Sequence, residues 1–169
     1  MFVLGHVGVG PRLLLGLRRR LPGGWLALGC LLPDLIDKPL FYALLWAEGH
    51  ADALISGSRS IGHSGLFFLL LLGIALVARR PGAWAVFAGV ATHLALDILG
   101  ELIMGADAET SIWLAILFPA LGWQFPRAYF SSMLEHLRIS AQSAYVVAGE
   151  ILGGAILVRG WLSRRRQSS

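Results

Sequence analysis

Six ionisable side chains of metal-ligand type lie inside, or at the edges of, stretches that are otherwise almost wholly apolar. They are His6, Asp34, Asp37, His63, His93 and Asp97. An ionisable group placed in hydrocarbon is costly, so each of these residues needs a partner. Imidazole and carboxylate groups are both good ligands for transition metals. The residue types therefore predict a metal site.

The spacing of these residues supports the same interpretation. His93 and Asp97 are four positions apart, so on a helix they face the same way, about one turn apart. His63 follows Ser60, a possible helix cap, and the dipole at a helix start disfavours the imidazolium form. A neutral imidazole is the form that binds metal. These spacings predict that several ligands can reach one ion.

The positions in the apolar segments also agree in depth. At about 1.5 Å per helical residue, Asp34 lies roughly 15 to 20 Å from the start of its segment, and His93 lies at a similar depth in its own. His6 and His63 lie near the opposite ends of theirs. All four segments therefore carry their ligands between the bilayer midplane and one face.

A set of His and Asp ligands without thiolates favours Zn²⁺, with Mn²⁺ or Fe²⁺ as alternatives. An open coordination position would hold a water whose pKa falls toward about 7, which gives a hydroxide nucleophile. Asp37 is a candidate catalytic acid or base, or a further ligand, unless it only pairs with Lys38. Nothing local neutralises Asp34. Arg59 is a second candidate catalytic residue, which could hold an anionic substrate such as a phosphate or could simply be solvated.

Three other polar residues are interpreted more simply. His50 and His136 lie in polar surroundings and are expected at the surface. Glu150, in an apolar segment, could support the ligands or carry a proton, although Gly149 and Gly153 beside it also indicate close helix packing.

The composition defines the class of protein. Of the 169 residues 56% are hydrophobic and only 14% are charged, which is more apolar surface than a soluble domain of this size can bury. We expect residues 1–169 to form a single integral membrane domain. The sequence pI near 10.0 does not indicate nucleic acid, because the arginines lie at the edges of apolar segments.

The expected fold is all-α, a polytopic membrane bundle of about five helices with a broken or re-entrant segment. Residues 2–17 contain Pro11 and predict a broken or partly inserted helix, and residues 24–47 contain Pro33 and Pro39 and predict a kinked or interrupted one. The remaining segments are 61–78, the clearest span; 83–104 and 143–162, two further spans; 112–123, re-entrant or interfacial; and 127–138, amphipathic.

Basic residues give the expected orientation. If the five long segments each cross once, the clusters Arg18 to Arg20, Arg79 with Arg80, and Arg159 with Arg164 to Arg166 share one side. Such clusters favour the cytoplasmic side. The expected location is the cell inner (plasma) membrane, with the N-terminus outside and the C-terminus cytoplasmic.

Three motifs in order resemble a known family. Leu32-Pro33-Asp34-Leu35-Ile36-Asp37, Gly62-His63-Ser64 and Thr92-His93-Leu94-Ala95-Leu96-Asp97, after an early His6, are similar to inner-membrane proteins described as metal-dependent hydrolases of the YdjM type. The ligand order is also distantly similar to zinc phospholipase C and P1 nuclease. That resemblance implies one site of Asp34, His63, His93 and Asp97, with His6 sharing a second through Asp97.

The leading hypothesis is a metal-dependent hydrolase that uses a metal-bound hydroxide on a phosphoester or lipid-linked ester. Its ligands would be His6, Asp34, His63, His93 and Asp97, and its partners the lipid bilayer and a membrane-associated substrate, with no nucleic acid. The alternatives are a divalent-cation or proton transporter and a metal-stabilised membrane scaffold. The inner halves of the segments are almost unbroken apolar sequence, which favours a site open to one side only.

Overall fold

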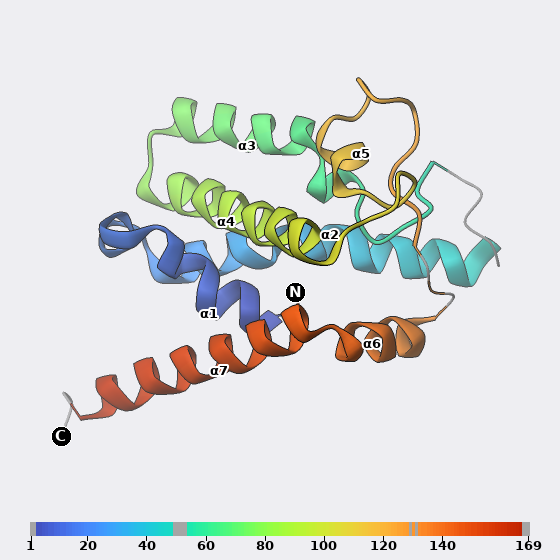
Figure 1. Cartoon of the computed structure of the whole chain (residues 1–169). Coiled ribbons are helices and arrows are strands. Elements are labelled where there is room, and N and C mark those ends of the chain that lie inside the picture. Colours follow the sequence, from blue (N-terminus) through green and yellow to red (C-terminus); the bar gives the residue numbers. More distant parts are fainter. Residues whose placement is uncertain (1–2, 49–53, 129, 131, 167–169) are drawn as a thin grey trace.

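The computed structural model describes residues 3–48, 54–128, 130 and 132–166, and helices are the only regular secondary structure within these, as expected (Figure 1). The elements in chain order are α1 (Val3–Leu13), the 3-10 helix η1 (Leu15–Arg20), α2 (Gly23–Glu48), the 3-10 helix η2 (Ile61–His63), α3 (Gly65–Ala78), α4 (Pro81–Met104), α5 (Ile112–Ile116), α6 (Met133–Gln142) and α7 (Ala144–Arg165).

Helices α2 and α4 form the centre of the molecule and pack along each other over much of their lengths. Helix α1 contacts both of them and lies between this pair and α7, while α3 runs beside α4 on the opposite side (Figure 1). The turn η2 packs on α2 at the end where α5 also lies. This arrangement brings four separate elements, α1, α2, η2 and α4, around one point.

Glycines allow the closest of these contacts. A Cβ on Gly89 of α4 would overlap the backbone of α2 at Leu26 and Cys30, and a Cβ on Gly8 of α1 would overlap Gly153 of α7. Small residues at such positions let helix backbones approach closely, which is the usual way helices associate in membranes. The glycines therefore set the spacing of α4 against α2 and of α1 against α7.

Within the part of the chain that the structure describes, two helices are long and apolar enough to cross a membrane, α4 and α7. They correspond to the expected spans 83–104 and 143–162. The expected span 61–78 is only partly a continuous α-helix. Its first residues form η2 and Ser64, and α3 itself has 14 residues. At about 1.5 Å per residue α3 is roughly 21 Å long, shorter than the hydrocarbon layer.

Two expectations about broken helices have different outcomes. Helix α1 ends at Leu13, and after Leu15, whose φ is 45°, the chain continues as a 3-10 turn. The segment 2–17 is thus broken, as expected. For 24–47, where a kinked or an interrupted helix was expected, an interruption is excluded, because α2 continues through both Pro33 and Pro39 over 26 residues.

The shorter segments are also more limited than expected. Only Ile112–Ile116 of the segment 112–123 is α-helical, followed by turns. The amphipathic helix expected at 127–138 begins later, at Met133, and ends at Gln142. Both lie at the same end of the bundle as η2 (Figure 1).

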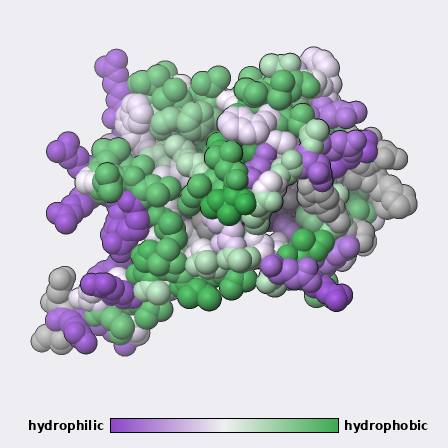
Figure 2. Space-filling model, viewed as in Figure 1, coloured by the Kyte–Doolittle hydropathy of each residue, from purple (hydrophilic) through white to green (hydrophobic). Residues whose placement is uncertain are grey.

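The basic clusters share one end of the bundle. The start of α2, the turn between α3 and α4, and the C-terminal end of α7 all lie at the left of Figure 1. In Figure 2 hydrophilic side chains gather at this end and at the opposite end, with a largely hydrophobic surface between them. Large apolar side chains such as Leu69, Val77 and Ile151 are exposed, at 60%, 85% and 69%. This banded surface is what a lipid-facing protein requires.

Candidate metal centre

Five of the six singled-out residues come together in one cluster. His6 comes from α1, Asp34 from α2, His63 from η2, and His93 and Asp97 from α4. Two overlapping groups have ligand atoms within 4.8 Å of one another: His6, Asp34 and His93, and His63, His93 and Asp97. His93 belongs to both groups and so lies at the centre of the cluster. The three imidazoles are at most 1% exposed.

The distances within the cluster describe a compact set of donors. His63 Nε2 lies 3.1 Å from His93 Nε2 and 3.5 Å from Asp97 Oδ2. His63 Nε2 lies 4.0 Å from Asp34 Oδ1, and His6 Nε2 lies 3.5 Å from Asp97 Oδ1. His93 Nε2 lies 4.0 Å from Asp97 Oδ2, as the spacing of four predicts. Donors separated by 3 to 4 Å surround a volume that one or two metal ions can occupy.

The tautomers of two imidazoles follow from their outer partners. His93 Nδ1 lies 2.7 Å from the carbonyl oxygen of Cys30, and His63 Nδ1 lies 2.7 Å from Asp37 Oδ2. Because a carbonyl and a carboxylate only accept, both Nδ1 atoms donate. In the neutral rings both Nε2 atoms then carry lone pairs, and these two atoms face each other. This arrangement needs a cation between them, and outer partners of this kind are usual for metal-ligating histidines.

The third imidazole fits a metal ion in the cluster. Among the described residues, neither ring nitrogen of His6 has a hydrogen-bond partner, although the side chain is buried. Its ring stacks on that of His93 with centroids 3.8 Å apart. A proton shared by His63 and His93 would leave the nitrogens of His6 without a partner, whereas a metal ion could also be bound by His6. The donor set fits a divalent transition metal, as predicted.

Asp37 is bound by the turn that carries His63. It is fully buried and accepts hydrogen bonds from the backbone N–H groups of Ser60, Gly62 and His63, from the Ser60 hydroxyl and from His63 Nδ1. Both carboxylate oxygens are therefore occupied by the turn that carries His63. Asp37 thus orients His63 and the turn that carries it, and its role as a catalytic acid or base stays a prediction.

Lys38 pairs with Asp34, and not with Asp37 as the sequence suggested. Lys38 donates to Asp34 Oδ2 at 2.7 Å, so the prediction that nothing local neutralises Asp34 is wrong, as is the pairing of Lys38 with Asp37. Residues four apart share a helix face, whereas adjacent residues diverge. Asp34 keeps its other oxygen, Oδ1, toward His63.

Arg59 lies beside the cluster, on the loop before η2. Its Nε is 3.4 Å from Asp97 Oδ2, and its terminal nitrogen is 3.8 Å from Glu101 Oε2. Glu101 in turn accepts from the Ser111 hydroxyl and from the backbone N–H of Ile112. Arg59 is 32% exposed, so the guanidinium is held against α4 and still faces a cavity.

The helix cap expected at Ser60 is formed by a different serine. The Ser60 hydroxyl donates to Asp37, and Ser64 caps α3 by accepting from Phe67 N. His63 therefore precedes α3 as part of η2, and its position depends on Asp37 rather than on the end of a helix.

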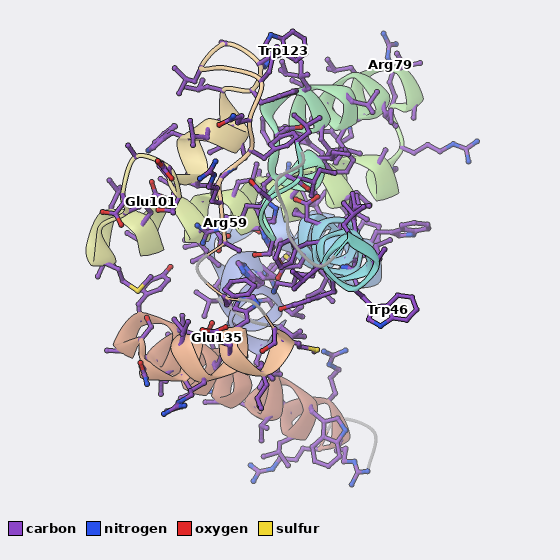
Figure 3. All side chains as sticks on the ribbon, turned by 90° about the vertical axis from the view of Figure 1, so that its right-hand side faces the viewer. Trp46, Arg59, Arg79, Glu101, Trp123 and Glu135 are labelled. Carbon is purple, nitrogen blue, oxygen red and sulfur yellow. The ribbon has the colours of Figure 1, made fainter. Side chains whose placement is uncertain are left out.

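A cavity of about 290 Å³ leads from the cluster to the end of the bundle opposite the arginines. Asp34 and Asp97 contribute to its inner wall, together with Lys38 and Arg59. Figure 3 looks onto this end and shows Arg59 near the middle, with Glu101 beside it and the α6 residue Glu135 below. Trp46 and Trp123 point outward at the periphery in the same view. The candidate metal site is thus open toward one end.

His136 is a cavity residue that the sequence did not reveal. It was expected at the surface, yet it is half-buried, lies 2.7 Å through Nδ1 from the Tyr42 hydroxyl and stacks on Phe130 at 4.0 Å. Burial and the nearby Lys38 ammonium lower the pKa of His136 from 6.5 to about 4. Only its alternation with apolar residues on an amphipathic helix could have indicated this. His50 lies outside the described residues.

Comparison of the chain with protein-family models, curated proteins and solved structures finds no match. The resemblance to YdjM-type hydrolases therefore stays a prediction made from the motifs. The functional argument depends on the geometry of the cluster and its cavity.

Proposed function

We propose that this chain is a membrane-embedded metal-dependent hydrolase that acts on a phosphoester or a lipid-linked ester. The observation that carries the proposal is the convergence of imidazole lone pairs and carboxylates at the inner end of an open cavity. Asp37 and the Cys30 carbonyl hold the Nδ1 protons of His63 and His93, and the nitrogens of the buried His6 make no hydrogen bond with the described residues. Donors arranged in this way support a metal site with access for a substrate.

The five clustered residues would hold the metal, for which zinc is preferred. The bound ion would supply a Lewis acid able to activate water near neutral pH. Around it, Asp37 and the Cys30 carbonyl keep two imidazoles in the ligand tautomer, and Lys38 offsets the charge of Asp34. These contacts hold the donors in place before a substrate enters.

The cavity walls support an anionic, amphipathic substrate. Arg59 and Lys38 present positive charge close to the cluster, and a guanidinium matches a phosphate in geometry. Met104, Ile139 and Val146 give the same cavity an apolar side. A phosphoester attached to a hydrocarbon chain would satisfy both.

The location that we propose is the inner (plasma) membrane, with several crossings and the arginine-rich end in the cytoplasm. The candidate spans α4 and α7, the exposed apolar surface and the shared end of the basic clusters support this topology. The cavity then opens on the outer side, where a lipid headgroup or a released product has direct access.

The same geometry supports an enzyme over a transporter. Toward the arginine end α2 and α4 are packed by a cluster of buried apolar residues, Leu26, Ala85 and Ala88. A transport pathway would need polar groups to continue through this region. An open cavity also has no use in a site whose metal is only structural. These two observations support the proposed hydrolase over the two alternatives.

The proposal is tested on protein purified in detergent. Metal content is measured by mass spectrometry, and turnover is measured with bis(p-nitrophenyl) phosphate and with phosphatidic acid in mixed micelles. We expect at least one bound divalent ion and a metal-dependent phosphoesterase activity that Asp97→Asn abolishes. Glu109→Gln is the matched control, because Glu109 lies at the surface and pairs with Arg127. A metal-loaded protein without turnover on either substrate would contradict the enzymatic assignment.

A further inference from the structure

The start of α1 is held by a side chain from the last helix. Glu150 of α7 accepts a hydrogen bond from Leu4 N at 3.0 Å through Oε2 and another from Gly5 N at 2.8 Å through Oε1. The first N–H groups of a helix have no partner within the helix, and a carboxylate there also interacts favourably with the helix dipole. Both oxygens of Glu150 are thus used to cap α1 from another element.

The backbones of the two helices also touch at this point. Gly153 lies against the backbone of Leu4 and Gly5, and Gly8 lies against Gly153, so closely that a Cβ on either glycine would overlap the other helix. Helix α1 has 11 residues, and an isolated helix of that length is marginal in water. The position of α1 is therefore set by its contacts with other helices, including this one.

His6 follows the capped residues directly. Its imidazole is 1% exposed, and neither nitrogen has a hydrogen-bond partner among the described residues. The hydrogen bonds that orient His63 and His93 through Nδ1 thus have no counterpart at His6, which stacks on His93 and faces Asp97 Oδ1 at 3.5 Å. The placement of its ring depends on where α1 lies.

We propose that Glu150 is a positioning residue for the metal site, which holds α1 against α7 so that His6 points at the ligand cluster. The inference rests on the metal binding in the proposed function and goes further, because it makes α7 part of the site although α7 supplies no ligand to the cluster. Replacing Glu150 leaves two N–H groups without their acceptor and frees the start of α1. The resulting loss of metal affinity falls on His6, because no hydrogen bond from a described residue orients its ring.

The test is a double-mutant cycle on metal affinity. Wild type, Glu150→Ala, His6→Ala and the double variant are purified in detergent, and Zn²⁺ affinity is measured by competition with a chromophoric chelator. We expect Glu150→Ala to weaken the affinity by about 10- to 100-fold, as outer partners of ligands do. In the His6→Ala background the same substitution should cause no further change, because Glu150 acts through His6.

A second readout distinguishes this role from general stabilisation. The visible spectrum of the Co²⁺-loaded protein reports its coordination, and Glu150→Ala should change it in the same way as His6→Ala. Glu150→Gln keeps one acceptor oxygen and should lie between wild type and Glu150→Ala. Glu109→Gln, the same chemical change at the surface, should match wild type. Circular dichroism establishes whether each variant keeps its helix content. If Glu150→Ala loses helix content, the affinity and spectrum of Glu150→Gln decide whether Glu150 positions His6.

The outcomes separate the two proposals. Wild-type protein that binds no ion would overturn both of them. Unchanged affinity in the Glu150 variants, or an equal loss with and without His6, would overturn the positioning role and leave the proposed hydrolase in place. Full metal binding without phosphoesterase turnover would overturn the proposed hydrolase and leave the positioning role of Glu150 in place.

Discussion

His63 and His93 face each other through their Nε2 atoms at 3.1 Å, and each ring is anchored through its other nitrogen. The anchors differ in kind, a carboxylate for His63 and a backbone carbonyl for His93, and they lie on the same helix, α2. When both imidazoles held in this way are neutral, they present lone pairs to each other. The pair is therefore arranged for a cation before any cation binds.

Metal binding should depend on His93 more than on any other ligand. His93 belongs to both ligand groups, whereas His6 and His63 each belong to one. We expect His93→Gln to weaken Zn²⁺ affinity by more than the roughly 100-fold loss typical of outer partners, and His6→Gln to weaken it less. Chelator competition measures both. His136→Gln is the control, and equal losses in all three variants would contradict the central position of His93.

Replacing Asp37 should damage both stability and metal binding. In Asp37→Asn the new amide N–H₂ faces the backbone N–H groups of the turn, so buried donors lose their acceptor. We expect the free energy of unfolding to fall by about 3 kcal/mol, the scale for breaking a buried charged network. Thermal unfolding in detergent measures the loss, and Asp107→Asn, at an exposed position, should show none. A variant as stable as wild type would show that the turn does not need this carboxylate.

His136 should make the protein less stable in mild acid. Its pKa is about 4 in the folded state and 6.5 ordinarily, so between these values the unfolded chain binds more protons. Its contribution to stability is present above pH 6.5 and is lost as the pH falls toward 4. The charged and titratable groups near it are Lys38, Asp34, Arg59 and Tyr42. Unfolding midpoints from pH 7 to pH 4.5 should decline less in His136→Asn than in wild type, and parallel declines would contradict this.

The proposed orientation predicts a labelling pattern in intact cells. Cys30 is the only cysteine and is buried, so Cys30→Ala gives a background without thiols. In this background a membrane-impermeant maleimide should label Ala106→Cys, beside the cavity. It should label Ser163→Cys, at the arginine-rich end, only after the cells are opened. The reverse pattern would place the cavity in the cytoplasm.

The sequence predicts the cluster well because helical spacing and membrane depth are simple geometry. His93 and Asp97 share a face of α4 as their separation requires, and equal depth brings His6, Asp34 and His63 to the same level. Each of these inferences uses only the rise of a helix and the direction of the chain. Tertiary detail is not needed for them.

The roles around the cluster could not be predicted in the same way. Asp37 and Lys38 are adjacent in sequence and yet point apart, so their nearness suggests an ion pair that the helix does not allow. The contact of His136 with Tyr42 joins residues 94 positions apart, and no local pattern encodes it. The start of α3 depends on which serine hydrogen-bonds to Asp37. The Ser60 hydroxyl makes this bond only when the turn packs on α2, and Ser64 is then the residue that caps α3.

The hydrogen bonds between Glu150 of α7 and the start of α1 also have a consequence for biosynthesis. All the clustered donors lie between positions 6 and 97, whereas Glu150 comes more than fifty residues later. The chain is synthesised from its N-terminus. The hydrogen bonds from α1 to Glu150 can therefore form only after α7 has left the ribosome. Ion loading should therefore be a late event in the maturation of this protein.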